Sequence, residues 1–160
     1  MKLYHFTSKH HLHGIGRYGL TVGDVPTDLQ GNKGRCGVWL TSDSNPSGNG
    51  LEGSVVDKSQ FRLTVDAPEN PLLVRWVHWA ANNATPLTVR GLHAAASGFE
   101  TWYVYFGVID RAAIEQCVDM RTGKIVEGWS DLPQSELVKP VPPWRRHEWH
   151  KKLLKKVRRG

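Results

Sequence analysis

Leu3-Tyr4-His5-Phe6-Thr7-Ser8 is the stretch that decides how the fold begins. Its apolar, aromatic and β-branched side chains predict a strand over residues 2–7. Ser8 is a preferred N-cap residue, so a helix is expected to follow at once and to cover residues 9–17. Gly19 is placed to end that helix in a left-handed conformation. The sequence therefore predicts a strand–helix unit with a histidine, His5, inside the strand.

The same patterns predict an α+β domain for the rest of the chain. The densest run of aromatic and β-branched residues, 101–109, predicts a central strand. Asn70-Pro71 is typical of a helix start, because asparagine caps helices and proline suits their first turn. The further elements expected are strands over 37–42, 60–66, 101–109 and 124–126 and helices over 71–82 and 86–98. Strands that cluster, rather than alternate with helices, favour a mixed sheet with short flanking helices over a doubly wound parallel sheet.

Charge divides the chain into unequal parts. The 160 residues carry a formal net charge of +6. Residues 144–160 hold eight Lys or Arg and one Glu, whereas residues 1–143 hold 13 Lys or Arg and 14 Asp or Glu. Prolines and a lack of periodicity predict a linker over 128–143. We expect one folded domain over 1–127, then this linker, then a basic amphipathic helix over 144–160.

The basic tail combines positive charge with tryptophan. Its cations, with Trp144 and Trp149 among them, suit phosphate contacts and base stacking. The expected apolar face consists of His150, Leu153, Leu154 and Val157. The residues expected to bind nucleic acid are Arg145, Arg146, Lys151, Lys152, Lys155 and Lys156. An acidic partner protein, an anionic membrane surface and a solvated helix face are alternatives that the pattern leaves open.

Composition argues against several classes of protein. Cys36 and Cys117 have neither metal-ligand spacing nor a C-x-x-C arrangement, so we expect no metal and no disulfide-based scaffold. His10 and His13 share a helix face, but no carboxylate or cysteine completes a metal site with them. The N-terminus lacks an apolar signal region, and no apolar run reaches membrane-spanning length. We therefore expect a reducing, cytoplasmic setting.

Three separate segments carry residues suited to a nucleotide site. His5 can hold a ribose through its ring, and Trp39 offers a flat wall for stacking. Glu100, ahead of the strongest strand, can orient a hydroxyl or offset developing positive charge. Each residue alone is more commonly structural, so their order along the chain is what indicates a site. The residues expected to bind the cofactor are His5, Phe6, Thr7, Trp39, Thr41 and Ser42, and those expected in catalysis are Glu100 and His5.

Together these segments resemble the ADP-ribosyltransferase superfamily, in its histidine–aromatic–glutamate branch. That branch includes the poly-ADP-ribose polymerases, the RNA 2′-phosphotransferases and the bacterial enzymes that ADP-ribosylate DNA. The resemblance is carried by Tyr4-His5-Phe6-Thr7 with Gly19-Leu20, by Gly37-Val38-Trp39-Leu40-Thr41-Ser42, and by Glu100-Thr101-Trp102-Tyr103-Val104-Tyr105. It implies a split β-sheet and NAD as substrate, with His5 on the adenosine ribose, Trp39 on nicotinamide and Glu100 in catalysis.

The implied function is that of an NAD-dependent ADP-ribosyltransferase of bacterial or phage type, acting on a nucleic acid or a protein. Glu100 stands one residue away from the register of the polymerases, which leaves Thr101 in that place. A shift of one residue in a strand points a side chain to the opposite face. A module on the same fold that binds NAD, ADP-ribose or nucleic acid without turnover is one alternative. A nucleic-acid-binding accessory protein that acts through its basic tail is another.

Overall fold

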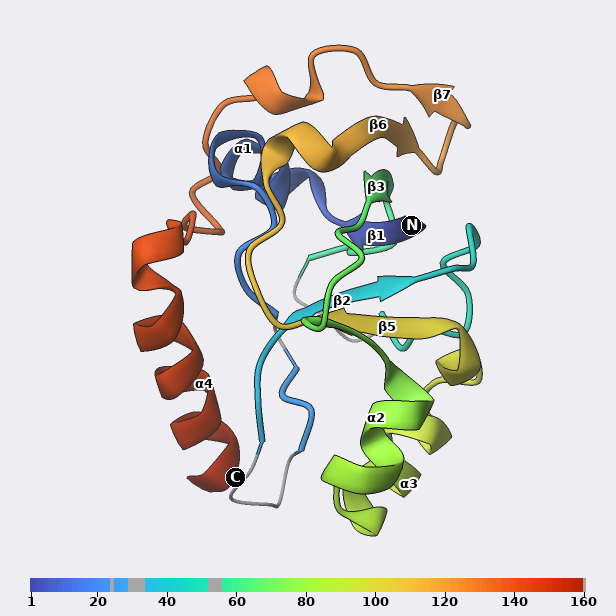
Figure 1. The fold of residues 1–160 in the computed structure, drawn as a ribbon. Coiled ribbons are helices and arrows are strands. Elements are labelled where there is room, and N and C mark those ends of the chain that lie inside the picture. The colour runs from blue at the N-terminus through green and yellow to red at the C-terminus, as the bar shows by residue number, and fades with distance from the viewer. Residues whose placement is uncertain (24, 29–33, 52–55, 160) are drawn as a thin grey trace.

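The computed structural model of the protein describes residues 1–23, 25–28, 34–51 and 56–159, with side chains through residue 157. Seven strands form one open sheet in the order β4-β5-β2-β1-β3-β6-β7 (Figure 1). The strands are β1 (Lys2–Thr7), β2 (Val38–Thr41), β3 (Phe61–Asp66), β4 (Leu73–Arg75), β5 (Trp102–Tyr105), β6 (Ile114–Asp119) and β7 (Lys124–Ile125). The α-helices are α1 (Lys9–Tyr18), α2 (Trp76–Asn83), α3 (Pro86–Ala95) and α4 (Arg146–Arg159).

The direction of the strands corrects one expectation. The fold is α+β, as the sequence predicts, but every pairing between these seven strands is antiparallel, so the sheet is not mixed. Local patterns locate strands without fixing which strands pair, and pairing is what decides their relative direction.

The sheet is nearly divided between β1 and β2. Strand β1 pairs with β3 along its whole length, from Lys2↔Asp66 to Thr7↔Phe61. With β2 it shares the single pair Tyr4↔Thr41. Helix α1 lies beside the half that contains β1, β3 and β6, whereas α2 and α3 lie beside the half that contains β2 and β5 (Figure 1). The two strands therefore part beyond one residue pair, and space opens between the halves.

The first helix confirms the sequence prediction in detail. The Ser8 hydroxyl accepts a hydrogen bond from the His10 N–H at 3.2 Å, which caps α1. Gly19 ends the helix with φ 79°, and its N–H donates to the Ile15 carbonyl at 2.8 Å. This backbone angle favours glycine, because other residues meet steric conflict there. Leu12 and Ile15 are buried, so α1 packs against the sheet through the predicted face.

The predicted helix over 71–82 is wrong in its first half. Residues 73–75 form β4, which pairs with β5 through Val74↔Val104 and its neighbours, and α2 begins only at Trp76. Asn70 caps a turn rather than the helix, since its Oδ1 accepts from the Leu72 N–H at 2.9 Å. Pairing with the edge of β5 overrides the local helical spacing, as tertiary context commonly does for short segments.

Other boundaries are shorter than expected. Strand β2 covers 38–41 rather than 37–42, β3 covers 61–66, and β7 covers 124–125. The predicted strand over 101–109 is limited to β5, because residues 99–101 form a 3-10 turn before it. Helix α3 ends at Ala95 rather than near Gly98. Strand β6, over Ile114–Asp119, is not among the expected strands.

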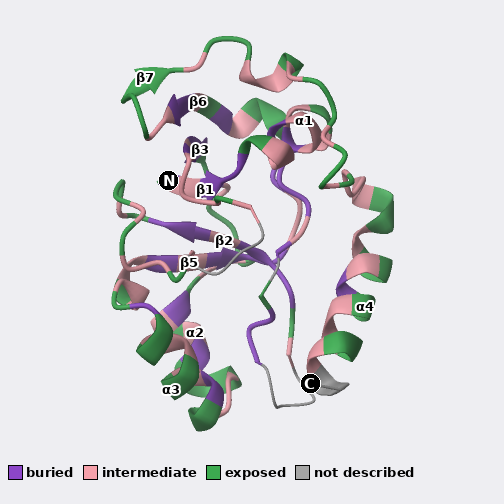
Figure 2. Ribbon diagram, turned by 180° about the vertical axis from the view of Figure 1, so that it is seen from behind, coloured by how far each residue is buried: buried purple, intermediate pink, exposed green. Residues whose placement is uncertain are grey.

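Two apolar clusters fill the two halves of the molecule, and Figure 2 shows the buried positions concentrated in the strands. The first cluster joins α1 to β1 and β3 and includes the fully buried Leu12 and Leu63. The second lies under α2 and includes Trp76, Trp102 and Val104. The first cluster also includes Val38 and Leu40 of β2, so core packing joins the two halves beside the space between β1 and β2.

The C-terminal segment packs against the folded domain rather than extending from it. The His13 ring donates through Nδ1 to the Leu132 carbonyl at 3.0 Å, and the His10 Nδ1 lies 2.6 Å from the Ser135 hydroxyl. Helix α4 begins at residue 146, after a 3-10 turn over 143–145. Its predicted apolar face is confirmed, because His150 is buried and the rest are half-buried, namely Leu153, Leu154 and Val157.

Candidate functional site

A cavity of about 560 Å³ opens where β1 and β2 part. Its walls come from β1, β2, α1, the end of α3, residues 19–23 with Val25, and residues 134–135 and 137–141 of the C-terminal segment. The volume lies within the range of about 300–1,000 Å³ that is usual for small-molecule sites. The five expected cofactor-binding residues that line it are His5, Phe6, Thr7, Trp39 and Thr41.

His5 links the two strands across this opening. Its Nδ1 lies 2.9 Å from the main-chain oxygen of Trp39. A carbonyl oxygen only accepts hydrogen bonds, so Nδ1 carries the proton. In the neutral ring Nε2 is then the acceptor, and the bond to β2 fixes the plane in which the imidazole lies. The structure thus orients His5 through its contact with Trp39 of β2.

Trp39 is held at the cavity wall by its neighbours. Its Nε1–H donates to the Val25 carbonyl at 2.8 Å. Its ring lies 5.0 Å from that of Trp76 and 5.7 Å from that of Trp102, measured between centroids. Aromatic pairs at these distances contribute roughly 0.5–1.5 kcal/mol beyond area burial. Trp102 also lines the cavity, which the sequence analysis did not predict.

Hydroxyl groups form an ordered chain at the end of β2. Thr101 donates to the Gly98 carbonyl at 2.8 Å, so its oxygen accepts from Thr41 across 2.7 Å. Thr41 in turn accepts from the Asp43 N–H at 3.0 Å. Thr41 is buried and lines the cavity, whereas Ser42 is exposed and does not line it. Of the three residues predicted to offer a hydroxyl, Thr7 and Thr41 therefore line the cavity and Ser42 does not.

Glu100 is placed apart from His5 and Trp39. It lies in the 3-10 turn before β5, its side chain is exposed, and it is not among the residues that line the cavity. Its main-chain oxygen accepts from Arg75 at 3.3 Å. Thr101, the next residue, turns toward Thr41 instead. The one-residue offset seen in the sequence therefore places a threonine, rather than the glutamate, beside the cavity wall.

The charged side chains along the described lining are Lys58 and Lys139, and none of these lining residues is Asp or Glu. Lysines on a lining whose described residues include no carboxylate favour an anionic ligand. The histidines that line it besides His5 are His10, His11 and His13. In the part of the chain that the structure describes, no group of three or more His, Cys, Asp or Glu is placed to hold a metal ion.

The C-terminal residues of the site escaped sequence analysis. Trp149 of α4 lines the cavity, together with Lys139 and Val141 of the segment before the helix. Helix α4 is held there by two hydrogen bonds, from the Arg146 Nε–H to the Thr21 carbonyl at 3.0 Å and from the Gly23 N–H to the His150 Nε2 at 3.4 Å. No local pattern signals this docking, since it joins segments more than 100 residues apart.

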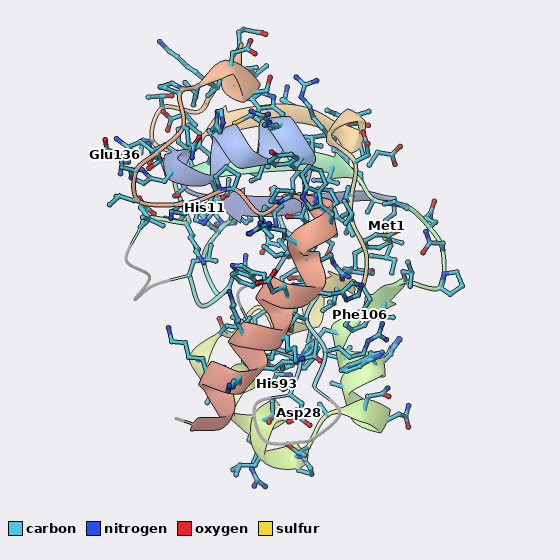
Figure 3. All side chains as sticks on the ribbon, turned by 90° about the vertical axis from the view of Figure 1, so that its left-hand side faces the viewer. Met1, His11, Asp28, His93, Phe106 and Glu136 are labelled. Carbon is cyan, nitrogen blue, oxygen red and sulfur yellow. The ribbon has the colours of Figure 1, made fainter. Side chains whose placement is uncertain are left out.

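The predicted nucleic-acid-binding residues fall into two groups. Arg146 is half-buried and anchors the helix, and burial lowers the pKa of its guanidinium. The exposed members are Arg145, Lys151, Lys152, Lys155 and Lys156. Figure 3 views the protein from the side on which α4 lies. Four of the exposed cations therefore lie on α4, and Arg145 lies in the 3-10 turn before it.

Comparison of the chain with protein-family models, with curated proteins and with solved structures finds no match. Among the described residues no helix is long and apolar enough to cross a membrane. Cys36 and Cys117 are both buried free thiols. The assignment of function therefore depends on the geometry of the site.

Proposed function

We propose that this chain is an NAD-dependent ADP-ribosyltransferase, with a fold of that superfamily's type, which binds NAD in the cavity between β1 and β2. One observation carries the proposal. The motif of His5 lies in β1, that of Trp39 lies in β2, and that of Glu100 leads into β5. These three strands are neighbours in the order β5-β2-β1. That order brings His5 and Trp39 to one cavity, where the His5 ring hydrogen-bonds to the main-chain oxygen of Trp39.

The cavity offers groups for each part of the dinucleotide. His5 holds a ribose hydroxyl, and Trp39 stacks against a planar ring such as nicotinamide. Lys58 and Lys139, both on the lining, supply positive charge for the diphosphate. Thr41 lies beside Trp39 on the lining and offers a hydroxyl to the amide or the ribose. Its volume of about 560 Å³ accommodates a ligand of this class.

Transfer breaks the bond between C1′ of the ribose and the nicotinamide nitrogen. Nicotinamide leaves with the bonding electron pair, and a nucleophilic atom of the acceptor forms the new bond to C1′ and gives up its proton. A carboxylate would accept that proton and offset the positive charge of the oxocarbenium-like transition state. Glu100 is the family-like candidate, and it must turn inward from its exposed position to act.

Binding without turnover is the second candidate function. The exposed position of Glu100, outside the cavity lining, is the observation that favours it. In this form the protein would hold NAD or ADP-ribose, and a nucleic acid or an acidic protein would engage the basic helix. The two functions differ in one measurable quantity, the release of nicotinamide.

Isothermal titration calorimetry with NAD, combined with chromatographic detection of nicotinamide, tests the proposal. His5→Gln is expected to weaken NAD binding at least tenfold, because it removes the oriented imidazole. His78→Gln is the matched control, since His78 is exposed on α2 and does not line the cavity. Circular dichroism establishes that both variants are folded. Equal NAD affinity of the two variants, or no NAD binding by the wild type, would refute the proposal.

Glu100→Gln separates the two functions. If the protein transfers ADP-ribose through this carboxylate, nicotinamide release falls at least a hundredfold while NAD affinity stays unchanged, since Glu100 does not line the cavity. NAD binding with no nicotinamide release by the wild type selects the binding module instead. We also propose a cytoplasmic setting in a bacterium or phage, in keeping with the two free thiols.

A further inference from the structure

One side of α4 carries a row of cations that meets the cavity. Taking about 100° per residue around the helix axis, Lys156 lies roughly 20° and Lys152 roughly 60° from Trp149. Arg145 lies in the 3-10 turn that directly precedes α4. Trp149 lines the cavity, whereas the three cations are exposed. We call Arg145, Trp149, Lys152 and Lys156 the cavity-side row.

The row is fixed relative to the cavity because α4 is docked. Arg146 and His150 lie roughly 60° and 100° around the axis from Trp149, on the flank away from Lys152, and hydrogen-bond with the main chain of Thr21 and Gly23. These two residues themselves belong to the cavity wall. Exposed and half-buried positions alternate along α4 (Figure 2), as expected for a helix held along one side. The cations therefore keep a set distance from the space proposed for NAD.

The row suits a nucleic acid strand better than a flat acidic surface. From Trp149 to Lys156 the helix rises by about 10 Å, along which a stacked strand presents roughly three phosphates. Trp149 stands between the cations at the cavity, where an unpaired base can stack on its ring. Glu148 is the one acidic residue of α4, and it pairs with Lys152 at 3.3 Å. Both groups of that pair are exposed, so phosphate can compete for the lysine at little cost.

We infer that the cavity-side row binds single-stranded nucleic acid and directs one nucleotide toward the cavity. Lys152, Lys156 and Arg145 contact phosphates, and Trp149 stacks on a base. A duplex cannot offer an unpaired base to this ring, so single strands are preferred. This inference rests on the proposed function for its role, because it makes the strand the acceptor of ADP-ribose, but the binding itself is measured without NAD.

Two double variants of equal charge test the inference. Lys152→Gln/Lys156→Gln neutralises the row. Lys151→Gln/Lys155→Gln removes the same charge from positions roughly 160° and 120° away from Trp149. All four lysines are exposed, so neither change disturbs a buried contact. Fluorescence anisotropy of a labelled 20-nucleotide strand, as DNA and as RNA, measures the dissociation constant over a range of salt concentrations.

We expect the first variant to weaken binding at least fivefold and the second less than twofold. The slope of log affinity against log salt should decrease by roughly one to two in the first variant alone. Equal losses in the two variants would show a general charge effect and overturn the inference, as would no binding by the wild type. Displacement of the strand by polyglutamate at the same charge concentration would overturn it in favour of an acidic protein partner.

NAD titration of the Lys152→Gln/Lys156→Gln variant separates this inference from the proposed function. Neither lysine lines the cavity, so NAD affinity should equal that of the wild type. NAD binding without strand binding by the wild type would reject the row and leave the proposed function standing. Strand binding without NAD binding by the wild type would do the reverse.

Discussion

Asp28 holds one wall of the cavity to a helix, and its removal should destabilise the protein measurably. The carboxylate is 4% exposed. It accepts hydrogen bonds from the Thr88 hydroxyl at 2.7 Å, the Thr85 hydroxyl at 3.0 Å and the Thr85 N–H at 3.3 Å. Thr85 is the N-cap of α3, so the negative charge also faces the positive end of that helix dipole.

The expected loss for Asp28→Ala follows from these contacts. Thr88 is 2% exposed, so its hydroxyl loses a charged acceptor where water does not replace it. A hydrogen bond to a charged group contributes about 1.5–3 kcal/mol to stability. The Thr85 groups are half-buried and regain part of their bonding from water. Together with about 0.5 kcal/mol from the helix dipole, we expect a loss of about 3 kcal/mol.

Urea unfolding followed by tryptophan fluorescence measures this change, since the chain contains seven Trp. With a slope of about 2 kcal/mol per molar urea, a loss of about 3 kcal/mol lowers the midpoint by about 1.5 M. Asp66→Asn is the control, because Asp66 is 67% exposed in an ion pair with the N-terminus and should not shift the midpoint.

A second substitution makes the reasoning refutable. If the cost arises from the lost bond between the Thr88 hydroxyl and this carboxylate, Thr88→Val should cost less stability in the Asp28→Ala background than in the wild type. Equal midpoints for Asp28→Ala and Asp66→Asn, or additive losses in the double variant, would contradict the assignment of Asp28 as a buried clamp.

Three further predictions concern other sites. Burial raises the pKa of Cys36 to about 11 and that of Cys117 to about 12, so a thiol reagent at neutral pH should modify two equivalents only after unfolding, and rapid modification of the native protein would contradict this. Burial lowers the pKa of His93 from 6.5, so the contribution of this residue to stability is complete above that pH and is lost as the pH falls. His93→Gln should therefore flatten the decline of the melting temperature in acid. Equal melting temperatures of variant and wild type across the pH range would argue against this. Gly23→Ala should destabilise severely, because its Cβ would lie 1.8 Å from the Gly37 carbonyl oxygen, whereas Gly91→Ala in open space should stabilise α3 by about 0.5–1 kcal/mol; similar thermal unfolding of the two variants would refute this.

The sequence predicted best those features that depend on neighbouring residues. The cap at Ser8, the helix end at Gly19 and the apolar side of the last helix all depend on spacing within a few residues, and the structure confirms them. It also predicted the order of the motif residues, and His5, Trp39 and Thr41 do line one cavity.

It predicted least well those features that depend on pairing between distant segments. Leu73 and Val74 fall within the helix predicted over 71–82, but they pair with β5 and form a strand instead. Glu100 was predicted to be catalytic from its order in the chain. A 3-10 turn leaves its side chain exposed and places Thr101 against Thr41 instead. Turns of this kind depend on where the following strand joins the sheet, which a single sequence does not specify.

The sequence by itself determined that Leu3–Ser8 forms a strand carrying His5 and leads into a helix, because dihedral preference and capping act over a few residues. Only the tertiary structure decided that this strand would part from β2 after one residue pair, so that His5 borders a cavity instead of a packed core. Only it brought Trp149 to the same cavity, through hydrogen bonds from Arg146 and to His150. The physical reason is that such long-range contacts are selected by the packing of the whole chain, whereas local structure is selected by each residue and its neighbours.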